Sequence, residues 1–455
     1  MKQHSPFALA NIRYFIGFRV LFNCRFYYPV FTILFLDYGL TIEQFALLNS
    51  VWAASIFLAE VPSGALADLV GRKQLLLTTS VLMILEMALL SFVPLGNMNL
   101  VFWAFLLNRI FSGLAEAMAS GADEALAYDS LQEEGIEDHW PHVLSVMMRV
   151  QAAGTVITMS LGALLYDPAT VNAFFDFLGQ PSKFDQQVTM RFPLYLTLVL
   201  ASLSCITVLM MKETEATNAT SSSGSYLGEA LRALRLTIEA GGWILKTPFA
   251  LTVILFAMGY DHILRMIITM NSKYFRIIEL PEASFGFIGS AMALMGLFIP
   301  KVAEAMVKRY TPVENMLWLS ALTLTALCGL AAAIPYWGLL PMALVPAGLQ
   351  LTSFFTSHYL NRITDSSRRA TVLSFKGMAF NLAYGFIGLA FAVLMNQLRQ
   401  STSATNPQMG QALIENTAFT TALVWFIPYT CLLLIVAVPV ARHLLRHRRM
   451  HRQKG

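Results

Sequence analysis

The chain has 455 residues, of which 56% are hydrophobic and only 13% are charged. This is too little polar surface to coat a soluble globule of that size, so we expect the chain to use lipid as its solvent. The net charge of +4 does not indicate a nucleic-acid partner, because the basic residues are scattered over connecting segments and the C-terminal tail instead of forming one patch.

Long apolar segments recur from end to end, each near the roughly 20 residues that a helix needs to cross a hydrocarbon core of about 30 Å. Only helices or closed barrels satisfy the backbone in lipid, and the alternating pattern of barrel strands is absent. The first segment lacks a signal-peptide cleavage site and is expected to be a span. The predicted spans cover residues 11–36, 43–66, 74–93, 100–124, 143–165, 192–211, 249–270, 285–307, 313–334, 339–360, 370–394 and 418–440. The predicted fold class is an all-α integral membrane protein with about twelve transmembrane helices.

The spans fall into two six-helix halves, predicted at residues 1–211 and 248–441, with a basic cytoplasmic tail at 442–455. Residues 212–247 are predicted to be a cytoplasmic linker that contains a polar low-complexity run at 220–224. Apolar residues then recur at helical spacing with arginines on another face, which is typical of an amphipathic helix on the inner leaflet. These apolar residues are Leu227, Leu231, Leu234 and Ile238.

Lysine and arginine are concentrated on one side of the predicted spans. If the N-terminus is cytoplasmic, the cytoplasmic connections carry Arg72, Lys73, Lys212, Arg232, Arg235, Lys246, Lys308, Arg309, Arg362, Arg368 and Arg369. The opposite side carries only Lys183, Arg191, Lys273, Arg276 and Arg399. This asymmetry predicts a multi-pass protein of the plasma (inner) membrane with both termini in the cytoplasm.

The connection between the second and third spans reads Gly64-Ala-Leu-Ala-Asp68-Leu-Val-Gly71-Arg72-Lys73. It closely resembles the G-x-L-a-D-r-x-G-r-k signature of the major facilitator superfamily. In the fourth span, Arg109-Ile-Phe-Ser-Gly113 resembles the second motif of that family. The resemblance implies a twelve-helix transporter that works by alternating access, with the first motif as a gate. We expect Arg72 of this motif to pair with Asp129.

Two features depart from the family pattern. The second-half counterpart of the gating motif, near residues 304–312, is degraded. The fifth span contains Gly154 and Gly162 but lacks the glycine-proline pair that is associated with antiporters in this superfamily. The second departure argues against export by antiport.

Ionisable side chains near the bilayer centre cost about 2.5 to 3.5 kcal/mol each on insertion scales, so each needs a partner, a water-filled cavity or a function. Near the bilayer centre we place six cations and six carboxylates, a balance that favours internal pairing. They are Arg19, Arg25, Arg109, Arg149, Arg265 and Lys376, with Glu60, Glu86, Glu116, Asp123, Glu124 and Asp261. From their depths we expect Arg19 to pair with Glu60, and Asp123 with Arg149.

Arg109, Glu116 and Asp123 are seven residues apart and drift by only about 20° per heptad, so they line one stripe of the fourth span. One of the two carboxylates would take a proton whose movement is coupled to a solute, and the alternative is a static ionic strut. Asp261 is the other coupling candidate, although its i,i+4 neighbour Arg265 most simply neutralises it. The nearby His262 is more simply a packing residue.

A second set of side chains is predicted to line a substrate cavity for an aromatic or anionic organic solute. The set contains Arg19, Arg25, Tyr28, Arg149, Gln350, His358, Lys376 and Tyr384. The cysteines stand apart inside apolar runs, without C-x-x-C spacing or a histidine cluster, so we predict no metal site and no cofactor.

The leading hypothesis is secondary active transport of a small organic solute by alternating access, as proton-coupled efflux of a drug-like or siderophore-like cargo. Uptake of a metabolite by a symporter or uniporter is the alternative. A non-transporting membrane receptor or scaffold is the alternative of another class. An enzyme is not expected, because H-E-x-x-H, G-x-S-x-G and Walker sequences are absent. We expect a monomer whose partners are the solute, protons and the lipid bilayer.

Overall fold

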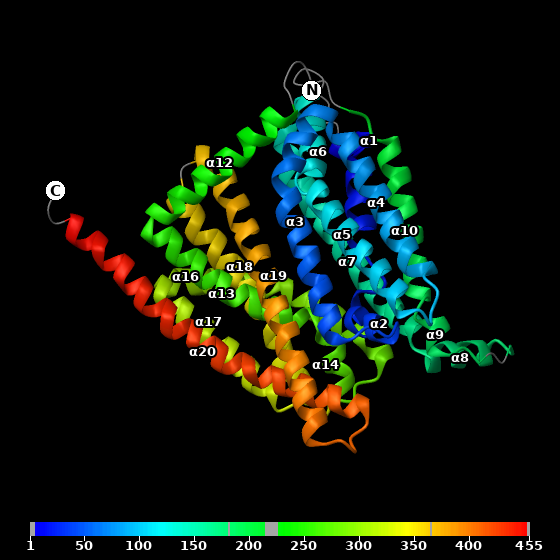
Figure 1. The fold of residues 1–455 in the computed structure, drawn as a ribbon. Coiled ribbons are helices and arrows are strands. Elements are labelled where there is room, and N and C mark those ends of the chain that lie inside the picture. The colour runs from blue at the N-terminus through cyan, green and yellow to red at the C-terminus, as the bar shows by residue number, and fades with distance from the viewer. Residues whose placement is uncertain (1–4, 181–182, 214–225, 365, 453–455) are drawn as a thin grey trace. The chain divides into compact units, whose positions relative to one another are not determined.

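The computed structural model describes residues 5–180, 183–213, 226–364 and 366–452, and every element of regular structure in these ranges is helical. The described residues contain twelve helical segments that are long and apolar enough to cross a membrane, which confirms the predicted fold class (Figure 1). Each predicted span overlaps one of them. The polar run at 220–224 lies outside the described residues.

The helices fall into two compact units. Unit 1 comprises Met1–Thr41, Val51–Leu234 and Pro281–Ala291, and unit 2 comprises Ile42–Ser50, Arg235–Leu280 and Met292–Gly455. The helices of unit 1 are α1 (Ala10–Asn23), α2 (Phe31–Asp37), α4 (Arg72–Phe92), α5 (Met98–Ala119), α6 (Ala122–Glu133), α7 (Trp140–Tyr166), α8 (Pro168–Phe177), α9 (Gln186–Thr189) and α10 (Phe192–Met210). Those of unit 2 are α13 (Pro248–Thr269), α14 (Asn271–Ile277), α16 (Ile299–Arg309), α17 (Pro312–Ala331), α18 (Leu339–Ile363), α19 (Ser366–Thr405) and α20 (Gln411–Arg452). Three helices contribute to both units, namely α3 (Ile42–Val70), α12 (Tyr226–Lys246) and α15 (Phe285–Leu294).

Unit 1 is organised around α4, which lies alongside α5 and α10 (Figure 1). Apolar side chains of these helices and of α1 form a continuous core, in which Phe18, Leu76, Met83 and Ala115 are fully buried. Small residues on α5 and α10 allow these helices to approach α4 closely, as expected where lipid supplies no hydrophobic force between helices.

The first span of unit 1 is interrupted. Helix α1 ends at Asn23, and a 3-10 turn at Tyr28–Val30 precedes α2. Pro29 stands in this turn; it has no backbone N–H to donate and disfavours a helical residue before it. The backbone N–H of Phe26, freed by the interruption, donates to the Thr197 hydroxyl at 3.1 Å. A side chain of α10 therefore satisfies the backbone of the broken span.

Helix α7 presses directly against this interruption. A Cβ atom added to Gly162 of α7 would lie only 1.7 Å from the carbonyl oxygen of Phe26, so no larger residue fits without a backbone shift. The glycine that the sequence offers in the fifth span is thus a contact point for the broken first span.

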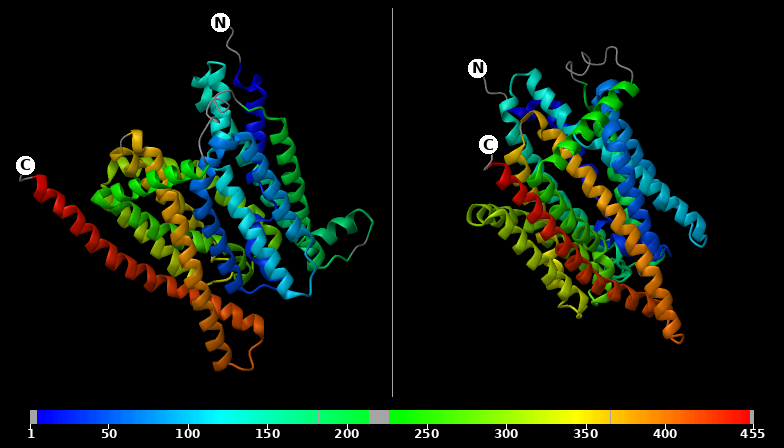
Figure 2. Two further views of the ribbon diagram at one scale, coloured as in Figure 1. Left: turned by 45° about the horizontal axis from the view of Figure 1, so that its top comes forward. Right: turned by 60° about the vertical axis from the view of Figure 1, so that its left-hand side comes forward.

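Unit 2 is organised around α13, which packs against α18, α19 and α20 (Figure 2). The hydroxyl of Tyr260 on α13 lies 2.5 Å from the Ser320 hydroxyl and 3.2 Å from the Met316 carbonyl, both on α17. His262 is also buried. Its Nδ1 lies 2.5 Å from its own helix's Met258 carbonyl, and its Nε2 lies 2.9 Å from the Tyr429 hydroxyl on α20. Because a carbonyl can only accept, Nδ1 carries the proton and Nε2 accepts from Tyr429, so His262 is a satisfied packing residue.

Replacing Gly162 with alanine tests the contact between α7 and Phe26. We expect Gly162→Ala to lower the free energy of unfolding by about 1 to 3 kcal/mol, the usual cost of overpacking, measured as a lower midpoint of thermal unfolding in detergent. Gly259→Ala is the matched control, because nothing lies within 4 Å of an added Cβ in the interior of α13. Alanine there should leave the midpoint unchanged or raise it. Equal midpoints for the two variants would contradict the proposed contact.

Candidate functional site

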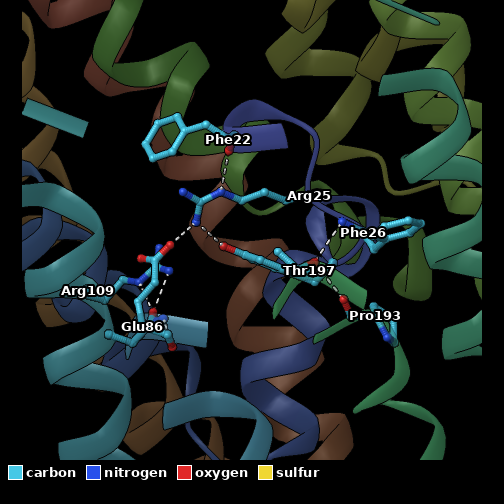
Figure 3. A network of polar contacts seen from close by, with 9 residues as sticks. Phe22, Arg25, Phe26, Glu86, Arg109, Pro193 and Thr197 are labelled. Carbon is cyan, nitrogen blue, oxygen red and sulfur yellow. Dashed lines mark hydrogen bonds and ion pairs between the residues drawn. The ribbon is translucent and has the colours of Figure 1, made fainter. Parts of the chain in front are cut away.

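A buried ion pair joins the interrupted first span to the third. The Arg25 guanidinium donates from Nη1 to Oε1 of Glu86 on α4, and the two side chains are only 3% and 0% exposed (Figure 3). Nη1 also donates to the Tyr27 hydroxyl at 3.1 Å, and Nε donates to the Phe22 carbonyl at 3.4 Å. These contacts hold the guanidinium where α1 ends, so the interruption positions a charge inside the span.

Two partly accessible groups lie beside this pair. The Tyr28 side chain is 42% exposed, and its ring centre lies 5.9 Å from the Arg25 guanidinium. Glu116, in the last turn of α5, is exposed and within electrostatic range of Arg25 and Glu86. Among the described residues, Glu116 has neither an ion pair nor a hydrogen bond of its side chain. The site thus combines one neutralised pair, one accessible ring and one carboxylate with no partner of its own.

Arg109 is held without a carboxylate. Its Nε and Nη2 donate to the Asn108 side-chain oxygen at 2.9 and 2.7 Å, and its guanidinium lies 5.2 and 5.5 Å from the ring centres of Phe31 and Phe35. Asn108 in turn donates to the Glu86 backbone carbonyl at 2.9 Å. The aromatic faces stabilise the cation, and Arg109 lies beside Glu86 in Figure 3.

Two of the expected ion pairs are wrong. Arg19 pairs with Asp123 at 3.0 Å and with Glu124 at 2.7 Å, not with Glu60. Arg149 is exposed on α7, and its Nε donates to a backbone carbonyl of its own helix. The first turn of α6 carries both acids toward α1, which it packs against. Glu60 retains a buried carboxylate oxygen that has no hydrogen-bond partner among the described residues.

The expected stripe of Arg109, Glu116 and Asp123 is also interrupted. Helix α5 ends at Ala119, and α6 starts after Gly121, whose φ of 81° is left-handed. Glycine permits that conformation at no steric cost. Asp123 therefore belongs to a second helix and is 1% exposed, whereas Glu116 is exposed on the first. The heptad argument fails because it assumed one continuous helix.

The gating motif is held by two contacts in unit 1. Arg72 pairs with Asp129, as expected. The carboxylate of Glu213 accepts from the backbone N–H groups of Arg72 and Lys73 at 3.1 and 3.0 Å, which satisfies the start of α4. Gly71 makes this turn with a φ of 93°. The structure does not describe the surroundings of Gly64 or the side chain of Asp68.

Unit 2 carries the remaining charged candidates. Arg265 pairs with Asp261 at 2.7 Å, as expected for i,i+4 neighbours. On α19, the Tyr384 hydroxyl lies 3.2 Å from the Thr269 hydroxyl, and Lys376 lies within electrostatic range of Asp261 and Arg265.

Two further candidates of the predicted cavity lie on α18 of unit 2. Gln350 is half-buried, and the His358 ring stacks against Phe354 at 6.3 Å between ring centres. Within the described residues, no hydrogen bond or ion pair joins either of them to Asp261 or Arg265.

Three residues of these sites were missed by sequence reasoning as functional partners, namely Glu86, Asn108 and Glu213. Pro29 within the first span was the available signal, because it predicts a helix interruption next to Arg25. No local signal identifies Glu86 as the partner, since its rotation about α4 depends on packing.

The chain was compared with known proteins. A family model described as Major Facilitator Superfamily matches residues 14–388. The crystal structure of the nucleoside transporter NupG is similar, with a TM-score of 0.71 and 12% identity, covering 96% of this chain and 99% of that chain. A bacterial homolog to the human lysosomal transporter Spinster, inward-facing and unoccupied, has a TM-score of 0.67 and 13% identity, covering 96% of each chain.

The partially occluded inward open xylose transporter XylE from E. coli has a TM-score of 0.60 and 11% identity, covering 95% of this chain and 96% of that chain. No curated protein sequence matches the chain. At these identities the similarity to solved structures concerns the fold alone.

A double-mutant cycle tests the buried pair. Arg25→Met should lower the free energy of unfolding by about 3 to 5 kcal/mol, because it leaves Glu86 buried without its counter-charge. The double variant Arg25→Met/Glu86→Leu should be more stable than Arg25→Met alone, as measured by thermal unfolding in detergent. The control cycle uses Arg235 and Glu239, an ion pair whose side chains are 81% and 58% exposed, and should show almost no coupling. Additive effects at Arg25 and Glu86 would refute a coupled pair.

Proposed function

The chain belongs to the Major Facilitator Superfamily, and on this basis we propose that it is a secondary active transporter that moves a small organic solute by alternating access and couples this movement to protons. Proton coupling is proposed because Glu116 is an accessible carboxylate inside a span. This carboxylate has no ion-pair partner among the described residues. A carboxylate in this position either binds a proton or attracts a nearby cation.

Arg25 lies within electrostatic range of Glu116 and donates a hydrogen bond to the Phe22 backbone carbonyl. When Glu116 is ionised, it competes with Glu86 for the charge of Arg25, and when Glu116 is protonated, Arg25 is left to Glu86 alone. Because Arg25 stands at the interruption of the first span, a change in its partner alters the forces on that interruption. Protonation of Glu116 would in this way bias the conformation of the span.

The other coupling candidates are proposed to act as supports. Asp261 is paired with Arg265, and Asp123 is paired with Arg19, whose guanidinium also pairs with the more exposed Glu124. An ion-paired carboxylate is stable in a span without a proton. Arg109 is proposed to hold the Asn108 side chain against the Glu86 backbone. Glu60, with a buried oxygen lacking a partner among the described residues, is the second carboxylate that we propose to exchange protons.

Cargo and direction are proposed from the resemblance to the family. Efflux of a drug-like or siderophore-like molecule stays the predicted direction, and uptake is the alternative. The structure of a D-xylose-proton symporter is similar to this chain, with a TM-score of 0.64 and 10% identity. The solute of that protein motivates xylose as a test solute here.

We also propose the membrane setting. The excess of lysine and arginine in the cytoplasmic connections supports the plasma (inner) membrane with both termini in the cytoplasm. The chain forms two compact units, and we propose that the protein acts as a monomer.

A flux assay tests the coupling role of Glu116. Proteoliposomes enclosing a pH-sensitive dye would receive uridine, D-xylose or benzoate, and the solute-dependent movement of protons would be recorded. We expect Glu116→Gln to reduce this proton movement at least tenfold, since the amide cannot be ionised, while exchange of radiolabelled solute at equal pH continues. Glu134→Gln is the matched control, because Glu134 is an exposed carboxylate at the end of α6.

Unchanged coupling in Glu116→Gln would assign the proton to another group. Solute binding without any flux in the wild-type protein would instead favour a receptor or scaffold.

A further inference from the structure

We propose that Lys376 and Arg265 bind a negatively charged group of the solute, so that the cargo is a small organic anion. This inference rests on the proposed transport function and names its substrate class. It is carried by the distribution of charge within unit 2, where a cation inside a span lacks a counter-charge.

The central charges are not balanced within each unit. Of the twelve predicted near the bilayer centre, unit 1 contains four cations and five carboxylates, whereas unit 2 contains two cations and one carboxylate. The three in unit 2 are Asp261, Arg265 and Lys376. Among these twelve central charges, unit 2 therefore has one more positive than negative charge.

The single carboxylate of these three residues, Asp261, forms an ion pair with Arg265. Asp261 Oδ2 lies 2.7 Å from Arg265 Nη2, and Arg265 Nη1 donates to the Asn381 side-chain oxygen at 2.9 Å. The Arg265 guanidinium lies over the Tyr384 ring, with its central carbon 5.4 Å from the ring centre. The Arg265 side chain nevertheless remains 27% exposed, so part of this guanidinium is accessible to a ligand.

Lys376 is the cation of this group for which the described residues provide no ion-pair partner. Its side chain is half-buried on α19, which packs directly against α13. Its Nζ lies 5.7 Å from the Phe380 ring centre, and the described part of the chain offers it neither an ion pair nor a hydrogen bond. Asp261 and Arg265 are the charged groups within its electrostatic range. An ammonium group in a span is costly unless it is paired, and a bound anion supplies the missing charge.

The balance of charge favours an anion with one negative charge, such as a carboxylate. One excess charge matches one negative charge, and an ammonium group has three donors that can adjust to its position. The exposed part of the Arg265 guanidinium, which is within electrostatic range of Lys376, supplies a second, planar donor group. Two rival explanations exist: Lys376 is neutral and fills space, or its flexible stem carries the charge to the membrane surface.

Ligand-dependent thermal stabilisation of the purified protein in detergent tests the inference without a membrane or a gradient. The probes are a series of monocarboxylates from acetate through benzoate to octanoate, together with benzamide, which matches benzoate in shape but is neutral. We expect benzoate to raise the unfolding midpoint of the wild type in a concentration-dependent manner, and benzamide to have no effect.

Substitutions of Lys376 distinguish the proposed anion site from the two rival explanations. Lys376→Arg, which is always charged, should retain benzoate binding within a fewfold, whereas Lys376→Met should weaken it at least tenfold. Lys301→Met, at an exposed lysine of α16, is the matched control and should bind as the wild type does. If Lys376→Met elutes as an aggregate, Lys376→Gln takes its place in the series.

Three results would overturn the inference: equal binding of benzoate and benzamide, wild-type affinity in Lys376→Met, or no stabilisation by any monocarboxylate. A protein that binds benzoate through Lys376 but moves neither solute nor protons would keep the anion site and reject the transport function. The two failures are therefore distinguishable.

Discussion

Arg25 and Glu86 bring opposite charges together at the point where the first span stops being helical. Neither group could stand alone in that position, because the energetic cost of an unpaired charge in a span exceeds what local packing returns. The interruption in turn requires partners for its exposed backbone, which Thr197 supplies, and a helix that can approach closely, which Gly162 permits. Much of unit 1 is therefore arranged to keep one ion pair buried and one stretch of non-helical backbone satisfied.

The same logic separates static from adjustable charges. Arg265 with Asp261 is a neutral pair that can remain in place, and Arg19 is held between the carboxylates of Asp123 and Glu124. Glu116 in unit 1 and Lys376 in unit 2 carry charges that no described side chain cancels. An uncancelled charge in a span costs free energy unless a mobile species neutralises it. Protons and solutes are the mobile species available to a transporter. The two units thus present opposite chemical requirements, each of which is met by a different species.

The sequence predicted the spans well because hydrophobic length is a local property that lipid enforces. It also predicted Arg72 with Asp129 and Arg265 with Asp261, where a motif or a helical repeat limits the choice of partner. It failed for Arg19 and Asp123, because equal depth in the membrane does not reveal which face of a helix a residue occupies. The break at Gly121 was missed because helical periodicity was extended across a glycine that ends a helix. Partners such as Glu86 depend on helix rotation, which only tertiary packing decides.

The interrupted first span also bears on how the chain enters the membrane during synthesis. Two of its arginines, Arg19 and Arg25, together add about 5 to 7 kcal/mol to the cost of inserting that segment by itself. The carboxylates that neutralise them lie on α4 and α6, which leave the ribosome later. The first segment therefore reaches its final depth only after these later helices have arrived, so biogenesis of unit 1 is cooperative across several spans and does not proceed one helix at a time.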